Sequence, residues 1–444
     1  MPVSGLHVVV GLGITGLSCV HYLKSRGLPV AVMDTRMNPP HLAALQKAYP
    51  DITVALGGLN SSLLQSAASI ILSPGIALYE PAIAEQVKRG IPVIGDIELF
   101  AQAVKAPVVA ITGTNAKSTV TTVVGKMAEA AGLNVQVGGN LGVPALDLLA
   151  KQPAADLYVL ELSSFQLETT HSLQSQVATV LNITPDHMDR YPTLADYQRA
   201  KHRIYQRCHT AVCNLDDPLT HTDTAHKLFF TLQAPRENTF GLLTKSSNTY
   251  LAYEDEALLA IDELPVMGKH YQANALASLA IGRGFGLALE PMLKVLRAFS
   301  GLPHRCQFVR ERQAVRWYND SKGTNVGATQ AAIEGLGSEI KGKLILIAGG
   351  VGKNADFTPL VPVIEKHVRQ VVLIGEAAKE LAAVIGNTVP VTFARTMEEA
   401  VQGAAAAAKP HDSVLLSPAC ASFDMFNHYE HRGQVFMEIV EKLN

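Results

Sequence analysis

The sequence predicts an α/β protein of three domains, each built on a mainly parallel sheet. Short runs rich in Val, Ile and Leu recur along the chain, and each ends in a glycine-containing turn followed by a helical stretch. Such runs are typical of strands buried on both faces of a parallel sheet, and their alternation with helices indicates βαβ units. The 444 residues correspond to three domains at roughly 150 residues each. We place the domains at residues 1–95, 96–301 and 302–444.

Composition excludes several classes of function. The 37 Lys and Arg residues against 39 Asp and Glu give a net charge of −2, which argues against nucleic acid or an anionic membrane as a general partner. The N-terminus lacks the basic start of a signal peptide, and no apolar run reaches the about 18 residues that span a bilayer. The five cysteines are scattered and odd in number, as in a reducing compartment. We therefore expect a cytoplasmic protein that binds no nucleic acid and does not insert into a membrane.

The first motif is a glycine-rich turn, GLGITG, at residues 11–16, which follows the strand HVVV and precedes a helix. Asp34 closes the next strand. This pattern is close to the fingerprint of a Rossmann-like domain, in which glycines let the backbone and a helix N-terminus approach a diphosphate. A nicotinamide or flavin cofactor, another diphosphate-linked group and a purely structural turn all remain open. The third block has similar glycine-ended strands, so we expect it to be Rossmann-like too.

The central block opens with ITGTNAKST at residues 111–119, between the strand VVAIT and a helix. This is the context of a phosphate loop in a P-loop ATPase-like domain, where Lys117 offsets phosphate charge and Ser118 or Thr119 can reach Mg²⁺. The spacing is shorter than in GxxxxGK[ST], and Ala116 stands where a glycine is usual. A left-handed backbone would cost alanine roughly 1 kcal/mol or more. We therefore predict a right-handed conformation at Ala116.

Further polar residues follow the buried strands of the central block. Glu161 ends the strand YVLE, where a carboxylate is costly without a cation, which favours a magnesium ligand. His187 follows another strand and should open at the same sheet edge, within reach of a metal or phosphate. Lys201 lies on a helix, where a lysine is typically a solvated charge. Between about residues 225 and 265, short alternating runs predict a small antiparallel addition at the sheet edge.

Seven motifs together resemble those of the Mur ligases of peptidoglycan synthesis, and they recur in order over essentially the whole chain. They are GTNAKST, LELSSFQLE, NITPDHMDRY, RAKHRIY, GLPHR, NDSKGTN and SPACASFD. The chain is most similar to the members that add D-glutamate to UDP-N-acetylmuramoyl-L-alanine. The resemblance implies a monomeric ligase that uses ATP to form an amide through an acyl-phosphate. It also implies two Mg²⁺ ions and a carbamate, derived from CO₂, on Lys201.

The same resemblance assigns residues to each ligand. The UDP-sugar substrate would contact Gly13, Ile14, Thr15, Asp34, Thr35, Arg36, Ser73, Pro74, Gly75, Asn140 and His187. ATP would contact Gly113, Thr114, Asn115, Ala116, Lys117, Ser118, Thr119, Asn274, Arg305 and Asp320. D-glutamate would contact Lys322, Thr324, Lys353, Ser422, Phe423 and, chiefly through its backbone, Tyr429. The metal ligands would be Ser118, Glu161, His187 and Lys201, and the catalytic residues Lys117, His187 and Lys201.

Three other functions share part of these features. A folate or other polyglutamate ligase would have the phosphate loop and the modified lysine, but it would not need a UDP-binding first domain. A nicotinamide dehydrogenase would explain only GLGITG and Asp34. A non-enzymatic nucleotide-binding switch would explain the phosphate loop and would leave the amino-acid pocket without a purpose.

Overall fold

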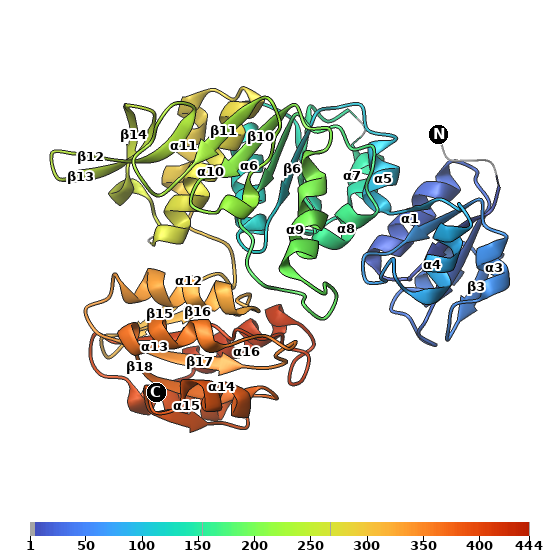
Figure 1. The fold of residues 1–444 in the computed structure, drawn as a ribbon. Coiled ribbons are helices and arrows are strands. Elements are labelled where there is room, and N and C mark those ends of the chain that lie inside the picture. The colour runs from blue at the N-terminus through green and yellow to red at the C-terminus, as the bar shows by residue number, and fades with distance from the viewer. Residues whose placement is uncertain (1–4, 153, 267, 444) are drawn as a thin grey trace.

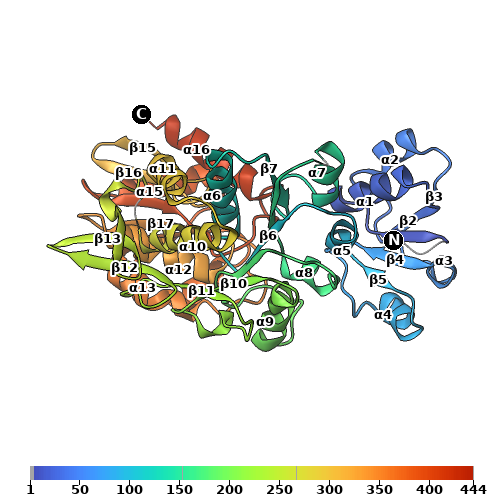
Figure 2. The ribbon, with the colours of Figure 1, turned by 90° about the horizontal axis from the view of Figure 1, so that it is seen from above.

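A computed structural model describes residues 5–152, 154–266 and 268–443, which form three α/β units in chain order (Figure 1). We call them the first, central and third units. Each contains one sheet, and each sheet lies within one of the three predicted ranges. The first and third units both border the central unit, and the view from above shows the first unit standing apart from the third (Figure 2).

The first unit holds a five-stranded sheet in the order β3-β2-β1-β4-β5, and all its neighbouring strands are parallel. Its central strands are buried along their whole length, as expected where helices cover both faces. The strands are β1 (His7–Val10), β2 (Val30–Asp34), β3 (Thr53–Leu56), β4 (Ser69–Leu72) and β5 (Val93–Ile94). The helices are α1 (Ile14–Ser25), α2 (Leu42–Ala48), α3 (Ser61–Gln65) and α4 (Pro81–Lys88). Helix α5 (Asp96–Ala101) opens the central range and contacts both α1 and α7 (Ala145–Lys151).

The central unit holds a nine-stranded sheet in the order β14-β13-β12-β11-β10-β9-β6-β8-β7. The predicted antiparallel addition is confirmed for β12 to β14, whereas β11 pairs in parallel with both neighbours. Residues 215–226 make the crossover that a parallel β11 requires. The strands are β6 (Val108–Thr112), β7 (Val135–Gly139), β8 (Leu157–Glu161), β9 (Val177–Val180), β10 (Thr210–Asn214), β11 (Lys227–Phe230), β12 (Thr239–Lys245), β13 (Asn248–Tyr253) and β14 (Glu256–Ala260).

Helices of the central unit cover this sheet and carry parts of the site. They are α6 (Lys117–Ala130), α7 (Ala145–Lys151), α8 (Ser164–Glu168), α9 (Leu194–His202), α10 (Lys269–Phe285) and α11 (Leu289–Ala298). Short 3-10 helices are η1 (Arg203–Tyr205), η2 (Pro218–Thr220) and η3 (Ile261–Glu263). None of the helices in the part of the chain described here combines the length and apolar character needed to cross a membrane.

The third unit holds a six-stranded sheet in the order β15-β16-β20-β17-β18-β19, in which only the β15–β16 pair is antiparallel among the described strands. The strands are β15 (Gln307–Arg312), β16 (Val315–Asn319), β17 (Leu344–Gly349), β18 (Val368–Ile374), β19 (Val391–Phe393) and β20 (Ser413–Leu416). The helices are α12 (Val326–Gly337), η4 (Thr358–Leu360), α13 (Val361–His367), α14 (Ala378–Ile385), α15 (Met397–Ala407) and α16 (Tyr429–Glu441).

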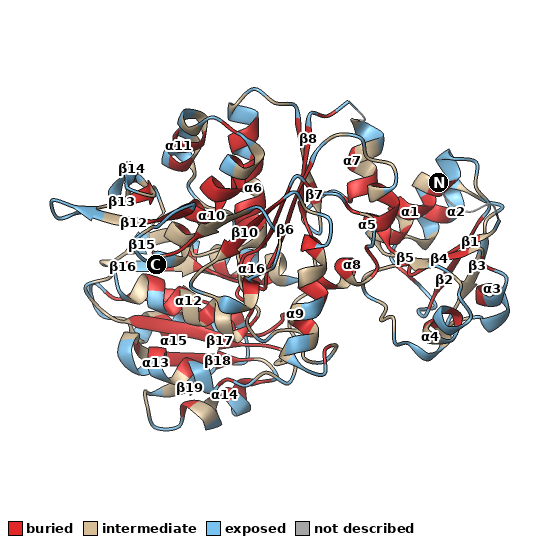
Figure 3. Ribbon diagram, turned by 45° about the horizontal axis from the view of Figure 1, so that its top comes forward, coloured by how far each residue is buried: buried red, intermediate tan, exposed pale blue. Residues whose placement is uncertain are grey.

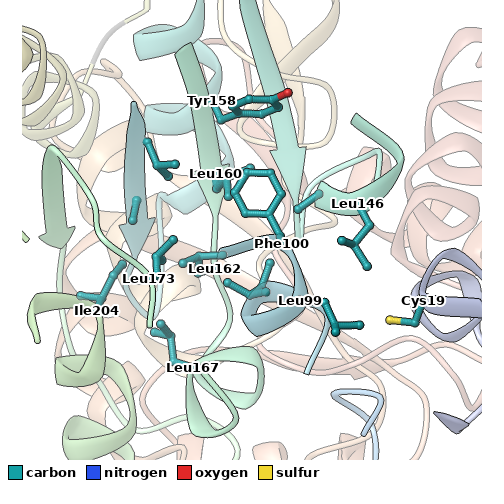
Figure 4. Packing of buried hydrophobic residues seen from close by; sticks show 14 of the residues in the cluster. Cys19, Leu99, Phe100, Leu146, Tyr158, Leu160, Leu162, Leu167, Leu173 and Ile204 are labelled. Atoms are coloured by element: carbon teal, nitrogen blue, oxygen red, sulfur yellow. The ribbon is translucent and has the colours of Figure 1, made fainter. Parts of the chain in front are cut away.

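The first and central units share one hydrophobic core. Cys19 of α1 belongs to the same buried cluster as Leu99 and Phe100 of α5 and Tyr158 of β8 (Figure 4). The Phe100 and Tyr158 rings meet edge to face, with centroids 5.2 Å apart. In contrast, the core clusters on the two faces of the third sheet contain only residues from position 306 onward, among those described. Buried strands run through each sheet (Figure 3). The third unit is therefore a separately packed body.

The parallel strands bring the predicted motifs to their carboxyl ends, where open α/β sheets bind ligands. In the first sheet, β1 leads into the GLGITG turn and β4 into Ser73. In the central sheet, the phosphate loop, Glu161 and the loop of residues 181–193 follow or end the adjacent strands β6, β8 and β9. In the third sheet, Asp320 follows β16.

Candidate active site

The phosphate loop turns between the end of β6 and the start of α6. Ala116, the N-cap of α6, has φ 68° and ψ −10°, so the predicted right-handed conformation is wrong. The short turn needs a left-handed residue to bring the helix back over the strand end. Asn182 fixes the loop in this form: its carbonyl oxygen and its Oδ1 accept from the backbone N–H groups of Thr114 and Asn115, at 2.9 and 2.8 Å.

Because alanine has no side-chain acceptor, the N–H groups in the first turn of α6 remain available to an anion. This helix has 14 residues, and the positive end of its dipole points into the loop. The position thus suits a phosphate group.

Two lysines converge on this loop. Lys117 Nζ donates to the carbonyl oxygens of Gly113 and Thr114, at 2.9 and 2.8 Å, and Lys201 Nζ donates to Gly113 O at 2.8 Å. Lys201 is buried, with its ammonium 4.5 Å from the centre of the Tyr197 ring. Burial, together with repulsion from Lys117, moves the pKa of Lys201 well below its ordinary value. The expectation that a helical lysine is solvated does not hold here.

Glu161 lies at the end of β8 beside these lysines. Its Oε1 accepts from Asn140 Nδ2 at 2.7 Å, while its buried Oε2 has no hydrogen-bond partner within the described residues. Burial alone would raise the pKa of Glu161, but Lys117, Asn140 and Ser118 lower it. The carboxylate is therefore ionised and has one oxygen left for a cation. We predicted that Asn140 holds the sugar substrate, but in this structure its side-chain amide donates a hydrogen bond to Glu161.

A first cavity of about 260 Å³ lies beside the phosphate loop, between the central and third units. Arg305 reaches across it, and its Nη2 donates to Ser118 Oγ at 3.1 Å. Burial raises the pKa of Asp320 to about 6, although Ser417 and the Cys306 N–H donate to its carboxylate. The predicted nucleotide contacts that line this cavity are Asn115, Ala116, Thr119, Asn274, Arg305 and Asp320.

A second cavity of about 300 Å³ adjoins the first and brings together His187, Thr324 and Lys353. His187 has φ 57° and packs edge-on against Phe165, with ring centroids 4.9 Å apart. Burial lowers the pKa of His187, although the neighbouring Asp186 opposes that shift. Lys353 donates to Asp186 Oδ1 at 3.0 Å.

The residues that we predicted for D-glutamate do not form one group in this structure. Lys322 lines the first cavity and donates to Tyr429 Oη at 2.9 Å, so Tyr429 participates through its side chain. Its backbone carbonyl instead accepts from Ser321 Oγ. Ser422 is buried and Phe423 is 74% exposed, and neither lines the second cavity. Only Thr324 and Lys353 of the set line the second cavity, whereas Lys322 lines the first and Tyr429 begins α16.

In the first unit, Asp34 faces the glycine turn, and its two carboxylate oxygens already accept four hydrogen bonds. Its Oδ2 accepts from Leu12 N and Arg36 Nη2, both at 2.7 Å, and its Oδ1 accepts from Arg36 N and Nε. These bonds, those of Arg36 above all, lower the pKa of Asp34 to about 2. A carboxylate has about four acceptor positions, so none is left for a ribose hydroxyl. This observation disfavours the nicotinamide interpretation.

The glycine turn is tightly packed against the neighbouring predicted residues. A side chain at Gly16 would collide with the carbonyl oxygen of Gly11, so α1 can approach the turn only with glycine there. Ser73 Oγ donates to the same Gly11 carbonyl at 2.9 Å. The structure thus brings Gly13, Ile14, Thr15, Asp34, Thr35 and Arg36 to the end of the sheet that also carries Ser73, Pro74 and Gly75.

Comparison with known proteins gives the family. Models of three domains match almost the whole chain: Mur ligase MurD-like, N-terminal domain (residues 5–95), Mur ligase middle domain (111–282) and Mur ligase, glutamate ligase domain (304–420). The chain belongs to the Mur ligase family.

Two relatives are similar over their full length. This Mur ligase is 53% identical over 439 residues to the UDP-N-acetylmuramoylalanine--D-glutamate ligase of Pseudomonas aeruginosa, with 98% of each chain covered. A protein of the same name from Nitrosococcus oceani is 53% identical over 444 residues, covering 99% of this chain and 97% of the other.

Two solved structures share the fold of this Mur ligase. The pseudomurein peptide ligase type C of Methanothermus fervidus has a TM-score of 0.63 at 18% identity and covers 99% of this chain and 100% of its own. The MurF ligase of Thermotoga maritima, in complex with ADP, has a TM-score of 0.63 at 17% identity and covers 99% and 96%.

Four residues of this Mur ligase that lie in or beside the site were missed by sequence reasoning: Asn182, Asp186, Arg190 and Asn325. Asp186 accepts from Lys353 and, at 3.2 Å, from Asn325 Nδ2, so it connects the central and third units. Asn325 also exchanges hydrogen bonds with the Asn115 side chain. The concentration of charged residues in NITPDHMDRY pointed to a functional loop, but the prediction included only its histidine among the site residues.

Proposed function

We propose that this Mur ligase joins D-glutamate to UDP-N-acetylmuramoyl-L-alanine, using ATP, in the cytoplasmic steps of peptidoglycan synthesis. The name carried by the full-length relatives supports this pair of substrates. The observation that carries the proposal is the convergence of Lys117, Lys201 and Glu161 on a phosphate loop that lines the first interdomain cavity, which adjoins the second. We also propose that a monomer is active.

We assign the first cavity to ATP. Its phosphates would lie at the N-terminus of α6, where backbone N–H groups are free and the helix dipole favours anions. Lys117 would exchange its carbonyl acceptors for phosphate oxygens, which are stronger partners for an ammonium group. Asn274, Arg305 and Asp320 would enclose the rest of the nucleotide.

Magnesium fits beside Glu161. The carboxylate is ionised, and its buried Oε2 lacks a partner among the described residues. Within those residues, no group of three His, Cys, Asp or Glu side chains could hold a metal alone, so phosphate oxygens and water would complete the coordination. We propose two ions, one at Ser118 and Glu161 and one nearer His187 and Lys201. Bound there, they would neutralise charge on the transferring phosphate.

We propose that Lys201 carries a carbamate. Its buried ammonium is disfavoured, and the neutral amine that results can add CO₂ and release one proton. The product is an anionic oxygen ligand, which suits a cation where an ammonium would repel it. Labelled ¹³C-bicarbonate should give a carbamate carbon signal in the wild type and none in K201R. The same signal in both proteins would contradict the assignment.

The reaction that we propose forms and breaks bonds in two steps. First, an oxygen of the alanyl carboxylate attacks the γ-phosphorus of ATP, and the bond to the bridging oxygen breaks to release ADP. Second, the D-glutamate amine attacks the acyl carbon, the C–O bond to phosphate breaks, and the amine loses a proton. Lys117 would offset the charge that develops during the first step. His187 would orient the acyl group at the border of the two cavities.

D-glutamate would enter the second cavity. A dicarboxylate needs cations and donors, and Lys353 and Thr324 are present there. Lys353 is paired with Asp186, so its ammonium is already oriented toward His187's loop. Lys322, Ser422, Phe423 and Tyr429, which we predicted for this substrate, would have to approach through a movement of the third unit.

Product analysis tests the proposal. The full chain is incubated with ATP, Mg²⁺, UDP-N-acetylmuramoyl-L-alanine and one of D-glutamate, L-glutamate, L-lysine or meso-diaminopimelate, and products are separated by mass. We expect one new amide product with D-glutamate and equimolar ADP and phosphate. Product formation with another amino acid and none with D-glutamate would contradict the proposed substrate. ADP release without any amino acid would favour a nucleotide switch.

A further inference from the structure

Arg190 is a buried arginine of the central unit that contacts the first unit. It lies in the loop between β9 and α9, three residues after His187. Its Nη1 donates to Pro74 O at 2.9 Å and its Nη2 to Ile76 O at 3.4 Å, both in the turn that follows β4. The side chain is only 9% exposed. These contacts cross the border between the two units that we assign to the sugar nucleotide and to ATP.

The remaining contacts of Arg190 fix the plane of its guanidinium. Nη2 also pairs with Glu168 Oε2 at 2.6 Å, and the guanidinium stacks over the Phe165 ring, 4.1 Å from its centre. The second oxygen of Glu168 accepts from Tyr191 Oη at 2.6 Å. A planar group with donors on two sides and an aromatic ring on its face has one orientation available.

The same elements hold His187. The Phe165 ring that carries Arg190 also packs against the His187 ring, and Arg190 N donates to His187 O at 2.9 Å. His187 has a left-handed backbone, which a non-glycine residue keeps only when its surroundings require it. Asp186, its neighbour in the chain, binds Lys353 and Asn325 of the third unit. One short loop therefore contacts all three units.

We propose that Arg190 is a positioning residue for the amide-forming reaction. It fixes the turn of residues 73–76, where the sugar nucleotide would lie, relative to His187 at the reacting carboxylate. This inference rests on the proposed function for its chemistry, although its geometry does not. Because the side-chain contacts of Arg190 are with two backbone carbonyls, the Glu168 carboxylate and the Phe165 ring, we expect its loss to affect alignment more than affinity. A misplacement of about 1 Å can cost roughly 100-fold in rate.

The main test compares R190K with the wild type and with R203A. Lysine keeps the positive charge, but a single ammonium cannot donate to Pro74 O and Glu168 while lying flat on Phe165. Arg203 is the matched control because it also donates to backbone carbonyls, those of Leu167 and Thr170, but only within the central unit. We expect kcat of R190K to fall by about 10- to 100-fold, with dissociation constants for ATP and UDP-N-acetylmuramoyl-L-alanine within about twofold of wild type.

R203A should lose thermal stability and keep the kcat of its folded fraction. Equal losses of kcat in R190K and R203A, or a wild-type kcat in R190K, would overturn the proposal. Chemical rescue gives a further readout: guanidinium at millimolar concentration should restore part of the kcat of R190A. Urea, which has a similar shape without the charge, should restore none. Rescue by both compounds would also contradict a charged positioning role.

Hydrogen exchange separates this proposal from the proposed function. In the ligand-free full chain, amides of residues 74–78 and 182–191 should exchange faster together in R190K and stay protected in R203A. Unchanged exchange in R190K would overturn the positioning role whatever the substrate is. If the wild type makes no amide product with D-glutamate, the proposed function fails, while the exchange result still decides whether Arg190 fixes the loop.

Discussion

Lys117 and Lys201 donate to the same acceptor, the carbonyl oxygen of Gly113, at 2.9 and 2.8 Å. Burial already disfavours the charge on both ammonium groups, and their mutual repulsion lowers the pKa of Lys201 further. The anionic groups nearby, Glu161 and Asp186, only partly oppose this shift. The carboxylates around the phosphate loop therefore do not fully balance the two lysines. A triphosphate, or a carbamate on Lys201, would supply the remaining negative charge.

Replacing Lys201 with methionine should stabilise the ligand-free protein and abolish activity. Because the folded pKa lies below the unfolded value of 10.5, the unfolded chain binds more protons between the two values. Wild-type stability therefore rises with pH across that window, and K201M should lack this slope. At pH 7 in bicarbonate-free buffer we expect K201M to be more stable by roughly 1–3 kcal/mol in urea unfolding. A less stable K201M, or an unchanged slope, would contradict this account.

Glycine at position 116 should stabilise the phosphate loop. Ala116 has φ 68°, where its Cβ costs roughly 1–2 kcal/mol, and glycine loses about 0.5–1 kcal/mol through unfolded-state entropy. A116G should therefore gain up to about 1.5 kcal/mol in denaturant unfolding. Ala130→Gly, at an exposed right-handed position of the same helix, is the control and should lose stability. Destabilisation of both variants would show that position 116 is not strained.

Asp320 should make the protein less stable as pH rises from about 4 to 6. Burial raises its pKa to about 6 from 3.8, so the folded chain holds a proton that the unfolded chain has released in this window. Asp96 is also buried with a pKa of about 6, so it should contribute an equal fall in the free energy of unfolding over this pH range. D320N and D96N should each remove about half of this combined pH dependence of stability, measured by urea unfolding at several pH values. Only D320N should also weaken ATP binding. If both variants keep the whole pH dependence of the wild type, the raised pKa values of Asp320 and Asp96 would be contradicted.

The third unit should close on the central unit when ligands bind. Polar contacts join the two units, such as Lys353–Asp186 at 3.0 Å and Arg305–Ser118 at 3.1 Å, and polar contacts of this kind can rearrange at little cost. We expect the radius of gyration from X-ray scattering to fall when ATP and UDP-N-acetylmuramoyl-L-alanine are both present. K353M should raise it in the ligand-free protein, and Lys366→Met, at an exposed position of the same unit, should not. One unchanged radius in all ligand states would refute closure.

The elements and their order could be predicted because each is encoded locally. Strands such as VVAIT and LILIAG are continuous apolar runs, and the glycine turns after them mark the sheet edge at which the motifs meet. The conformation of Ala116 could not be predicted in this way, because it depends on hydrogen bonds that Thr114 N and Asn115 N donate to Asn182, which lies far along the chain. The burial of Lys201 likewise depends on how α9 packs against the phosphate loop.

The partners of the site residues were the hardest to predict. Lys322 and Tyr429 are 107 positions apart, and Asp186 and Lys353 are 167 apart, so no local pattern pairs them. Arg190 has the same difficulty, since its acceptors are backbone carbonyls, which any residue type supplies. The residue types in each loop indicate its chemistry, but which loops line the same cavity depends on how the three units are placed relative to one another.

The most direct test of the central claim follows one oxygen atom. UDP-N-acetylmuramoyl-L-alanine labelled with ¹⁸O in both oxygens of its alanyl carboxylate is converted with ATP and D-glutamate, and the inorganic phosphate is analysed by mass. Activation of the carboxylate by phosphorylation predicts one ¹⁸O atom in each phosphate released and one retained in the amide. Phosphate free of ¹⁸O, formed together with the amide product, would contradict it.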